Sequence, residues 1–155
     1  MSGWTFAEIW ETAAAQLPDA PFAKQGSRTV TWSQAERRAE GLASYLLDSG
    51  AGHQDKVAQY LYNCPEYLET VFASFKLRST PVNVNYRYLA DEVAYVLDNA
   101  DAEVLVFHGS LGDRVEGAIG RLPRLRVLAH LQDDRLNQTD LFRGPALGLQ
   151  CQSFP

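Results

Sequence analysis

The residues in this sequence that could do chemistry are few and widely spaced. His53, His108 and His130 stand apart, and none has a second His, Cys or carboxylate at the spacing of a metal site. His108 falls at the end of a predicted strand, where a general acid or base could act. Because no nucleophile stands near it in the sequence, we favour a strand-end or surface role for all three side chains.

Cys64 is a second candidate for reactivity, since it precedes Pro65 at a predicted helix start. The dipole of that helix could lower the pKa of the thiol. We favour the simpler interpretation, a small side chain packed near the helix N-terminus. Cys151 lies far away in the sequence, and so sparse a use of cysteine is typical of a reducing compartment.

A phosphate-binding loop with the pattern Gly-x-x-x-x-Gly-Lys followed by Ser or Thr does not occur in the sequence. The nearest candidate, Gly109-Ser110-Leu111-Gly112, follows a predicted strand and opens a helix at the carboxyl edge of the sheet, where α/β proteins bind ligands. Its glycine spacing does not fit a dinucleotide-binding loop. We therefore predict a turn in which Ser110 caps the helix and Asp113 completes a capping box.

The segment Tyr86-Arg87-Tyr88 places a cation between two aromatic rings at the end of another strand. Arg87 could contact an anion, or it could pair with Asp91 one helical turn on. Neighbouring acids at positions 91–92 and 133–134 point in different directions, so they are expected to be solvated. A larger tyrosine set could line an apolar pocket but is more typical of core and interface positions. The set comprises Tyr60, Tyr62, Tyr67, Tyr86, Tyr88 and Tyr95.

The composition is that of one globular domain, since 46% of the 155 residues are hydrophobic and 21% are charged. The net charge of −5 disfavours nucleic acid and anionic membranes as partners. No stretch approaches about 18 uncharged apolar residues, and the acidic N-terminus does not resemble a signal peptide. We therefore expect a cytoplasmic protein without an integral membrane segment.

Two helices and a hairpin are predicted to come first. The helix over residues 5–17 begins with a Thr5–Glu8 capping box, and the next helix begins with a Thr31–Gln34 capping box. Between them, residues 22–24 and 28–30 are predicted to form a short β-hairpin.

Strands then alternate with helices, which predicts an α/β fold with an open, mostly parallel sheet of about four strands and flanking helices. The helix near residues 65–77 carries an apolar stripe of Leu68, Val71, Phe72 and Phe75. Residues 1–131 are predicted to form one α/β subdomain and residues 132–155 an irregular or disordered tail, which could be out of frame. The strands are expected near residues 57–61, 81–84, 104–107 and 126–129, and the helices near 65–77, 89–97 and 111–119.

A series of motifs runs through the first two thirds of the chain in a fixed order. They are Thr31-Trp32-Ser33-Gln34-Ala35, Asp55-Lys56-Val57-Ala58, Asn63-Cys64-Pro65-Glu66-Tyr67, Phe75-Lys76-Leu77, Thr80-Pro81-Val82-Asn83-Val84-Asn85-Tyr86-Arg87 and Leu97-Asp98-Asn99-Ala100-Asp101-Ala102. With them, residues 5–106 resemble the N-terminal portion of the acyl-CoA synthetase branch of the adenylate-forming (AMP-binding) enzyme superfamily. The resemblance implies an incomplete N-terminal subdomain of that fold.

The sequence departs from the family pattern at three places. His53-Gln54 stands where the family has a glycine just before Asp55. Arg78-Ser79-Thr80 replaces a small Gly-Ala-x turn, and this replacement is expected to alter the junction between helix and strand. Gln59 places an amide in a strand that is apolar in the family.

The resemblance implies a reaction in which a carboxylic acid, such as a fatty acid, reacts with ATP and Mg²⁺ to give an acyl-adenylate and pyrophosphate, after which CoA displaces AMP. The family residues that carry this reaction belong to later segments than those matched here. No catalytic, cofactor-binding or metal residue is therefore assigned in this chain. The expected function is an N-terminal fragment of an acyl-CoA synthetase, inactive by itself.

An alternative function remains open from the residues alone. A stand-alone α/β module could bind a small molecule or a protein at the carboxyl edge around Tyr86, Arg87, His108 and Gly109. A sheet without its covering partner could also self-associate through exposed apolar surface.

Overall fold

The computed structural model describes residues 4–131 and 142–143. Both predicted capping boxes are present, because the hydroxyl groups of Thr5 and Thr31 accept hydrogen bonds from the backbone amides three residues on. These caps begin α1 (Phe6–Gln16) and α2 (Trp32–Asp48). The predicted hairpin lies between them as β1 (Pro21–Gln25) and β2 (Arg28–Thr31), and its tight turn is possible because Gly26 adopts a φ of +58°.

Beyond α2 the chain alternates between strands and helices, as predicted. The elements are β3 (Lys56–Tyr60), α3 (Pro65–Lys76), β4 (Thr80–Asn83), α4 (Ala90–Asn99), β5 (Val104–His108), a 3₁₀ turn η1 (Gly109–Leu111), α5 (Gly112–Ile119), β6 (Val127–Leu131) and β7 (Phe142–Arg143). The strand order is β4-β3-β5-β6-β7, in which the first four strands are parallel.

Two residues of the predicted tail are described. They form β7, which pairs antiparallel with β6, so the described residues hold a second antiparallel pairing besides the hairpin. The remainder of the predicted tail, residues 132–141 and 144–155, lies outside the described residues.

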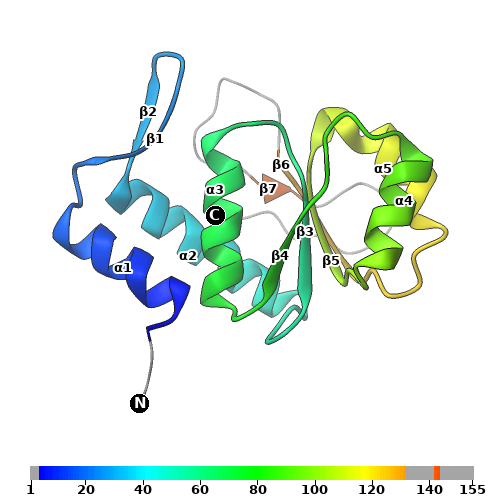
Figure 1. Cartoon of the computed structure of the whole chain (residues 1–155), viewed down its shortest axis with the longest axis horizontal. Coiled ribbons are helices and arrows are strands. Elements are labelled where there is room, and N and C mark those ends of the chain that lie inside the picture. Colours follow the sequence, from blue (N-terminus) through cyan, green and yellow to red (C-terminus); the bar gives the residue numbers. More distant parts are fainter. Residues whose placement is uncertain (1–3, 132–141, 144–155) are drawn as a thin grey trace.

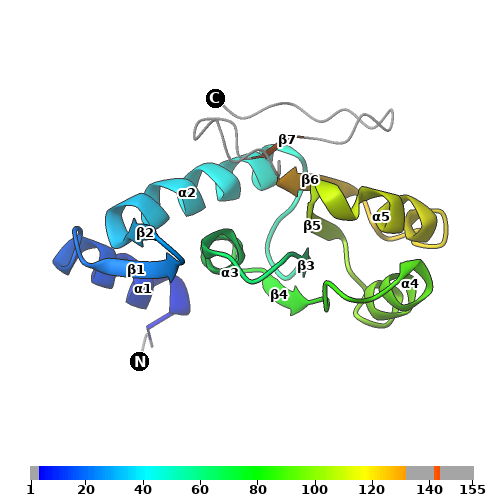
Figure 2. The same cartoon turned by 90° about the horizontal axis from the view of Figure 1, so that it is seen from above.

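The order in which strands are added to the sheet reverses after β4. The chain passes from β3 to β4 on one side, then returns past β3 to β5 and continues to β6. A constant crossover hand requires α3 on one face of the sheet and α4 and α5 on the other. Figures 1 and 2 show this arrangement, with α2 beside α3. The carboxyl ends of β3 and β5 therefore flank the topological switch point, where open α/β sheets bind ligands.

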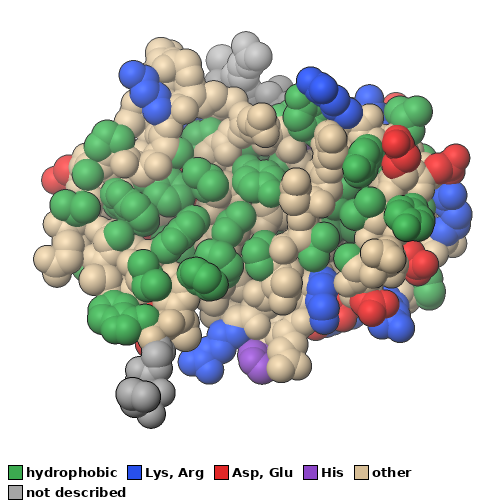
Figure 3. All heavy atoms as spheres, in the orientation of Figure 1, with side chains coloured by type: hydrophobic (Ala, Val, Ile, Leu, Met, Phe, Trp, Pro, Cys, Tyr) green, Lys and Arg blue, Asp and Glu red, His purple; other side chains and the backbone are tan. Residues whose placement is uncertain are grey.

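The apolar stripe of α3 is buried only in part. Only Phe72 of the expected stripe is fully buried, whereas Val71 and Phe75 are half-buried and Leu68 is 38% exposed. Besides Phe72, the buried residues of α3 include four polar ones, Glu66, Glu69, Thr70 and Ser74, together with Pro65 and Ala73. Figure 3 shows hydrophobic side chains gathered over α1 and α3 on this side of the molecule.

The reason for this orientation is the packing of α3 against α2 and the hairpin. Arg38 of α2 and Arg28 of β2 both reach the Glu66 carboxylate, and Arg38 also lies 3.2 Å from Glu69. Paired carboxylates can be buried, so the polar flank of α3 lies inside and its apolar flank is left outside.

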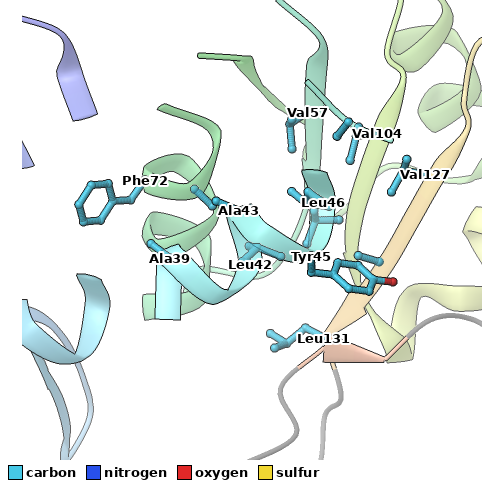
Figure 4. Close-up of a cluster of buried hydrophobic side chains, with 14 of the residues drawn as sticks. Ala39, Leu42, Ala43, Tyr45, Leu46, Val57, Phe72, Val104, Val127 and Leu131 are labelled. Carbon is cyan, nitrogen blue, oxygen red and sulfur yellow. The ribbon is translucent and has the colours of Figure 1, made fainter. Parts of the chain in front are cut away.

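The main core lies between α2 and the sheet. Leu42 and Leu46 of α2 are fully buried in the same cluster as Val57, Val104 and Val127, one residue from each of three neighbouring strands (Figure 4). A second cluster lies on the opposite face, between the sheet and the helices α4 and α5. Burial on both faces is what a parallel sheet requires.

Two residues that depart from the family pattern, Arg78 and Gln54, have left-handed backbone conformations. After α3 the amide of Arg78 donates to the Phe75 carbonyl and the amide of Ser79 donates to the Ser74 carbonyl, which is a Schellman cap. The cap requires a left-handed residue, and Arg78 has a φ of +54°. Gln54 likewise has a φ of +69°. The turn after α3 therefore forms with a non-glycine residue in a backbone conformation that favours glycine.

Candidate functional site: the carboxyl edge of the parallel sheet

Side chains that follow three neighbouring strands meet at the switch point. Tyr62 follows β3, Tyr86 follows β4, and His108 ends β5. The ring of Tyr62 lies 5.2 Å from the ring of Tyr86 and 4.8 Å from that of His108, measured between centroids. Two of the residues predicted at this edge, Tyr86 and His108, thus share Tyr62 as a neighbour, which was not predicted there. We call Tyr62, Tyr86 and His108 the edge cluster.

The orientation of His108 is fixed by the backbone. The amide of Tyr62 donates a hydrogen bond to Nδ1 of His108 at 3.1 Å, so Nδ1 is the acceptor nitrogen and the ring proton of the neutral form lies on Nε2. Nε2 in turn lies 4.0 Å from Sγ of Cys64. The side chain of His108 is buried, and it connects the end of β5 to the loop between β3 and α3.

Cys64 sits at the N-cap of α3, as its position before Pro65 predicts. Burial and the nearby Glu66 carboxylate raise the pKa of the thiol to about 12. The dipole-activated thiolate is therefore not favoured, and the packed, protonated side chain is the interpretation that the structure supports.

The segment Gly109-Ser110-Leu111-Gly112 does not form the predicted cap. Residues 109–111 are already a 3₁₀ turn, and α5 begins at Gly112 without a side-chain cap. An N-cap needs an extended backbone, which Ser110 does not have inside that turn. The hydroxyl of Ser110 lies 3.4 Å from that of Tyr62 instead, so this turn borders the edge cluster.

Arg114 of α5 holds the loop after β4 in place. Its Nη1 donates to the carbonyl oxygen of Tyr86 at 2.9 Å, and it lies 3.3 Å from both the carbonyl oxygen of Tyr88 and the hydroxyl of Tyr60. The Tyr60 hydroxyl donates to the same Tyr88 carbonyl at 2.5 Å. Sequence reasoning missed Arg114 because a single arginine on a helix carries no pattern that reveals three distant acceptors.

Arg87 is exposed, and its guanidinium lies over the Tyr86 ring at 5.6 Å from the centroid. Its predicted alternative partner, Asp91, is bound by Arg121 at 2.8 Å on the surface. The exposed Glu92 accepts from the amide of Leu89, so these two acids do not converge, as predicted.

The tyrosine set divides between core and surface and does not form one pocket. Tyr60 is fully buried, and Tyr67, Tyr86 and Tyr88 pack at the borders of the core. Tyr95, by contrast, is 70% exposed on α4. Packing at the core is confirmed for these first four, whereas Tyr95 and Tyr62 are exposed, and for these two an interface position stays a prediction.

The described residues hold two further histidines. His53 is exposed in the loop before β3, and His130 on β6 has its ring 6.0 Å from that of Phe107. Among residues 4–131 and 142–143, no three His, Cys, Asp or Glu side chains are grouped so as to hold a metal ion. Within the same residues, no helix combines the length and hydropathy needed to cross a bilayer.

A buried cluster of charged side chains lies at the start of α3. Glu66 and Glu69 are buried against Arg28 and Arg38. Burial raises the pKa of Glu69 to about 7, although Arg38 opposes this shift. The pKa of Glu66 is lowered, because its contacts with Arg28 and Arg38 outweigh its burial. The cluster anchors the hairpin to α3, and of its members only Glu66 stands in a motif of the sequence.

Further along α3, Lys76 joins three helices. Its Nζ lies 2.7 Å from carboxylate oxygens of Glu11 on α1 and Glu36 on α2, and 3.0 Å from Glu40. These contacts raise the pKa of Lys76 above its ordinary value against the effect of burial. This junction is structural, since the lysine is enclosed by its partners.

Comparison with known proteins links this fold to one group of enzymes. Residues 10–147 match the profile of the family described as AMP-binding enzyme. The medium-chain acyl-CoA ligase Mig of Mycobacterium avium is 34% identical over 150 residues, which cover 88% of this chain and 27% of that protein. The 3-oxocholest-4-en-26-oate–CoA ligase of Rhodococcus rhodochrous is 34% identical over 127 residues, which cover 82% of this chain and 23% of that protein.

Among solved structures, one described as a long-chain-fatty-acid CoA ligase of Rhodopseudomonas palustris matches with a TM-score of 0.77 and 32% identity. The match covers 84% of this chain and 33% of that one. The chain thus spans about a quarter of the length of the curated relatives it matches, at their N-terminal part.

Proposed function

Because the chain belongs to the AMP-binding enzyme family, we propose that it is the N-terminal portion of an ATP-dependent acyl-CoA ligase. The reaction of such a ligase joins a carboxylic acid to CoA through an acyl-adenylate. The observation that carries the proposal is the match of residues 10–147 to the family, together with the 34% identity to two CoA ligases. The fold is consistent with it, since the sheet, its flanking helices and the hairpin recur in the ligase of R. palustris.

The substrate class is proposed from the same relatives. One of them is named for medium-chain acyl groups and another for a steroid side-chain acid. We propose a carboxylic acid with a large apolar body, either a fatty acid or a steroid acid, as the substrate of the ligase to which this portion corresponds. A cytoplasmic location is proposed with it.

We propose further that residues 1–155 do not catalyse the reaction by themselves. ATP and Mg²⁺ need phosphate-binding amides, a lysine and carboxylate ligands, and the described residues do not fit them: they offer no grouped metal ligands. The edge cluster presents tyrosine rings and a histidine whose Nδ1 is occupied. In the proposed ligase, this portion provides the carboxyl edge of the sheet and the ion pairs that join α3 to α1 and α2.

The experiment compares two proteins in ATP–pyrophosphate exchange with medium-chain fatty acids and a steroid acid. The first is the chain alone, and the second is a chimaera in which this chain replaces the aligned N-terminal segment of the M. avium ligase. We expect no exchange above buffer for the chain and measurable exchange for the chimaera. Exchange by the chain alone contradicts the inactivity, and a folded but inactive chimaera contradicts the ligase assignment.

A stand-alone binding module is the second candidate, favoured by the meeting of Tyr62, Tyr86 and His108 at the switch point. Isothermal titration of the chain with ATP, AMP and an acyl-adenylate analogue tests it. Saturable binding that Tyr62→Ala abolishes supports the module. If none of the three ligands binds, the proposal of a nucleotide-binding module is rejected.

A further inference from the structure

The β1–β2 hairpin is separate from the five-stranded sheet (Figure 1), and polar contacts beside its turn join it to the start of α3. The side-chain amide of Gln25 donates a hydrogen bond to the Asn63 carbonyl at 2.9 Å. Arg28, on the other side of the turn, pairs with the Glu66 carboxylate. An ion pair and a hydrogen bond therefore attach this end of the hairpin to the beginning of the helix.

The ion pair of the hairpin belongs to a cluster in which two carboxylates share one arginine. Nη2 of Arg38 lies 2.9 Å from Oε1 of Glu66, and its Nε lies 3.2 Å from Oε2 of Glu69. Both carboxylates are almost fully buried, whereas the side chain of Arg28 is 42% exposed. Glu66 thus has two arginine partners, and Glu69 depends on the one that it shares.

Glu69 changes the charge of this cluster near neutral pH. Burial raises its pKa to about 7, so its neutral and ionised forms are both populated there. With Glu69 neutral, Glu66 is the one carboxylate for two guanidinium groups, and Arg38 is sufficient to neutralise it. With Glu69 ionised, two carboxylates face two guanidinium groups, so the second cation, Arg28, is attracted more strongly to the cluster.

We propose that the attachment of the hairpin to α3 is sensitive to protons: it tightens when the carboxyl group of Glu69 ionises and loosens when that group is neutral. The coupling is reciprocal, as linkage requires, because Arg28 favours the ionised form of Glu69 and that form favours the attached hairpin. A proton on a buried residue of α3 thereby controls how firmly the hairpin is held.

The charged groups that act on Glu69 come from three elements. They are Arg38 of α2, Arg28 of β2 and Glu66 of its own helix. The remaining charged side chains on the elements packed against α3 are exposed or bound elsewhere. Of those bound elsewhere, Glu11 and Glu36 pair with Lys76, and Lys56 donates to the Gln54 carbonyl.

Hydrogen–deuterium exchange of the full chain between about pH 6 and about pH 8.5 tests the proposal. Rates are read by mass spectrometry and corrected for the intrinsic pH dependence of amide exchange. Peptides over residues 21–31 report on the hairpin, and peptides over β5 report on the core. Because ionisation of Glu69 lowers the stability of the whole fold, it makes core amides exchange faster, whereas tighter attachment makes hairpin amides exchange more slowly. The two effects therefore have opposite signs.

We expect hairpin exchange in the wild type to slow about fivefold over this pH range, with no slowing in β5. Glu69→Gln cannot ionise, so its hairpin should exchange at every pH as fast as that of the wild type does at the lowest pH. Arg28→Gln removes the attracted cation and should also abolish the slowing. The matched control is Arg124→Gln, which removes a surface arginine paired with Asp101 and should behave as wild type.

Hairpin exchange that stays constant or becomes faster as the pH rises in the wild type overturns the proposal. Slowing that persists in Glu69→Gln, or in a folded Arg28→Gln, overturns it as well. Circular dichroism verifies that each variant is folded. If Arg28→Gln does not fold, the comparison of wild type with Glu69→Gln decides by itself.

Discussion

Arg114 of α5 donates a hydrogen bond to the backbone carbonyl of Tyr86 at 2.9 Å, although the two residues are 28 positions apart in the chain. The same nitrogen reaches the Tyr88 carbonyl and the Tyr60 hydroxyl. One guanidinium therefore sets the position of the loop that carries Arg87, and through Tyr86 it sets the position of the edge cluster.

Arg114→Met is expected to loosen this loop. Because three acceptors lose their donor, the exposed bond after Arg87 should be cut by trypsin about tenfold faster, as followed by mass spectrometry of the released peptide. Arg114→Lys should restore part of the protection, since it keeps one donor. The control is Arg124→Met, whose side chain pairs with Asp101 on the surface. Unchanged cleavage in the Arg114→Met protein would show that the loop is held by other contacts.

Arg78 and Gln54 occupy backbone conformations that favour glycine. Arg78→Gly and Gln54→Gly are each expected to raise the free energy of unfolding by about 1 kcal/mol, because the left-handed strain is removed. Urea denaturation measures the gain. Arg124→Gly, at an exposed position without a positive φ, should give no gain. A loss of stability in either variant would mean that the replaced side chain makes a stabilising contact.

The pKa of Glu69 predicts how stability varies with pH. Its folded pKa of about 7 lies above the ordinary value of 4.5, so the folded state holds a proton that the unfolded state releases between these values. Its contribution to stability is present below pH 4.5 and is lost as the pH rises to about 7. Glu69→Gln cannot ionise, so relative to wild type it should gain about 3 kcal/mol between pH 5 and pH 8.

Urea denaturation of both proteins at several pH values measures this difference. The other charged groups of the cluster, Arg28, Arg38 and Glu66, are the same in both proteins, so the difference reports the ionisation of Glu69 together with its coupling to them. Parallel pH curves for wild type and Glu69→Gln would contradict the raised pKa. Glu116→Gln, a change at an exposed carboxylate on α5, serves as the control and should follow wild type.

Gln59 is a polar side chain at a position that the sheet buries completely. Neither its amide nitrogen nor its amide oxygen has a hydrogen-bond partner among the described residues. Gln59→Leu removes that unmet demand and is expected to stabilise the fold by about 1–2 kcal/mol in urea denaturation. Gln16→Leu, at an exposed position in α1, should change stability little. Destabilisation by Gln59→Leu would indicate that the amide is satisfied in solution, for example by water.

The sequence by itself determined the elements and most of their order. The Thr5 and Thr31 capping boxes, the hairpin around Gly26 and the alternation of strands and helices all depend on contacts within a few residues, so they can be predicted from neighbours in the chain. The motifs that carry the family resemblance are read in the same way, and the match over residues 10–147 confirms them.

Only the tertiary structure decided which side of α3 is buried and how the edge cluster is assembled. Helical periodicity shows that α3 has two flanks, but it does not show that Arg28 and Arg38, far away in sequence, neutralise the polar one. Tyr62, Tyr86 and His108 meet because the order β4-β3-β5 brings three strand ends together. Burial and ion pairing depend on distances in space between segments far apart in the chain, and such distances are fixed by the packing of the whole fold.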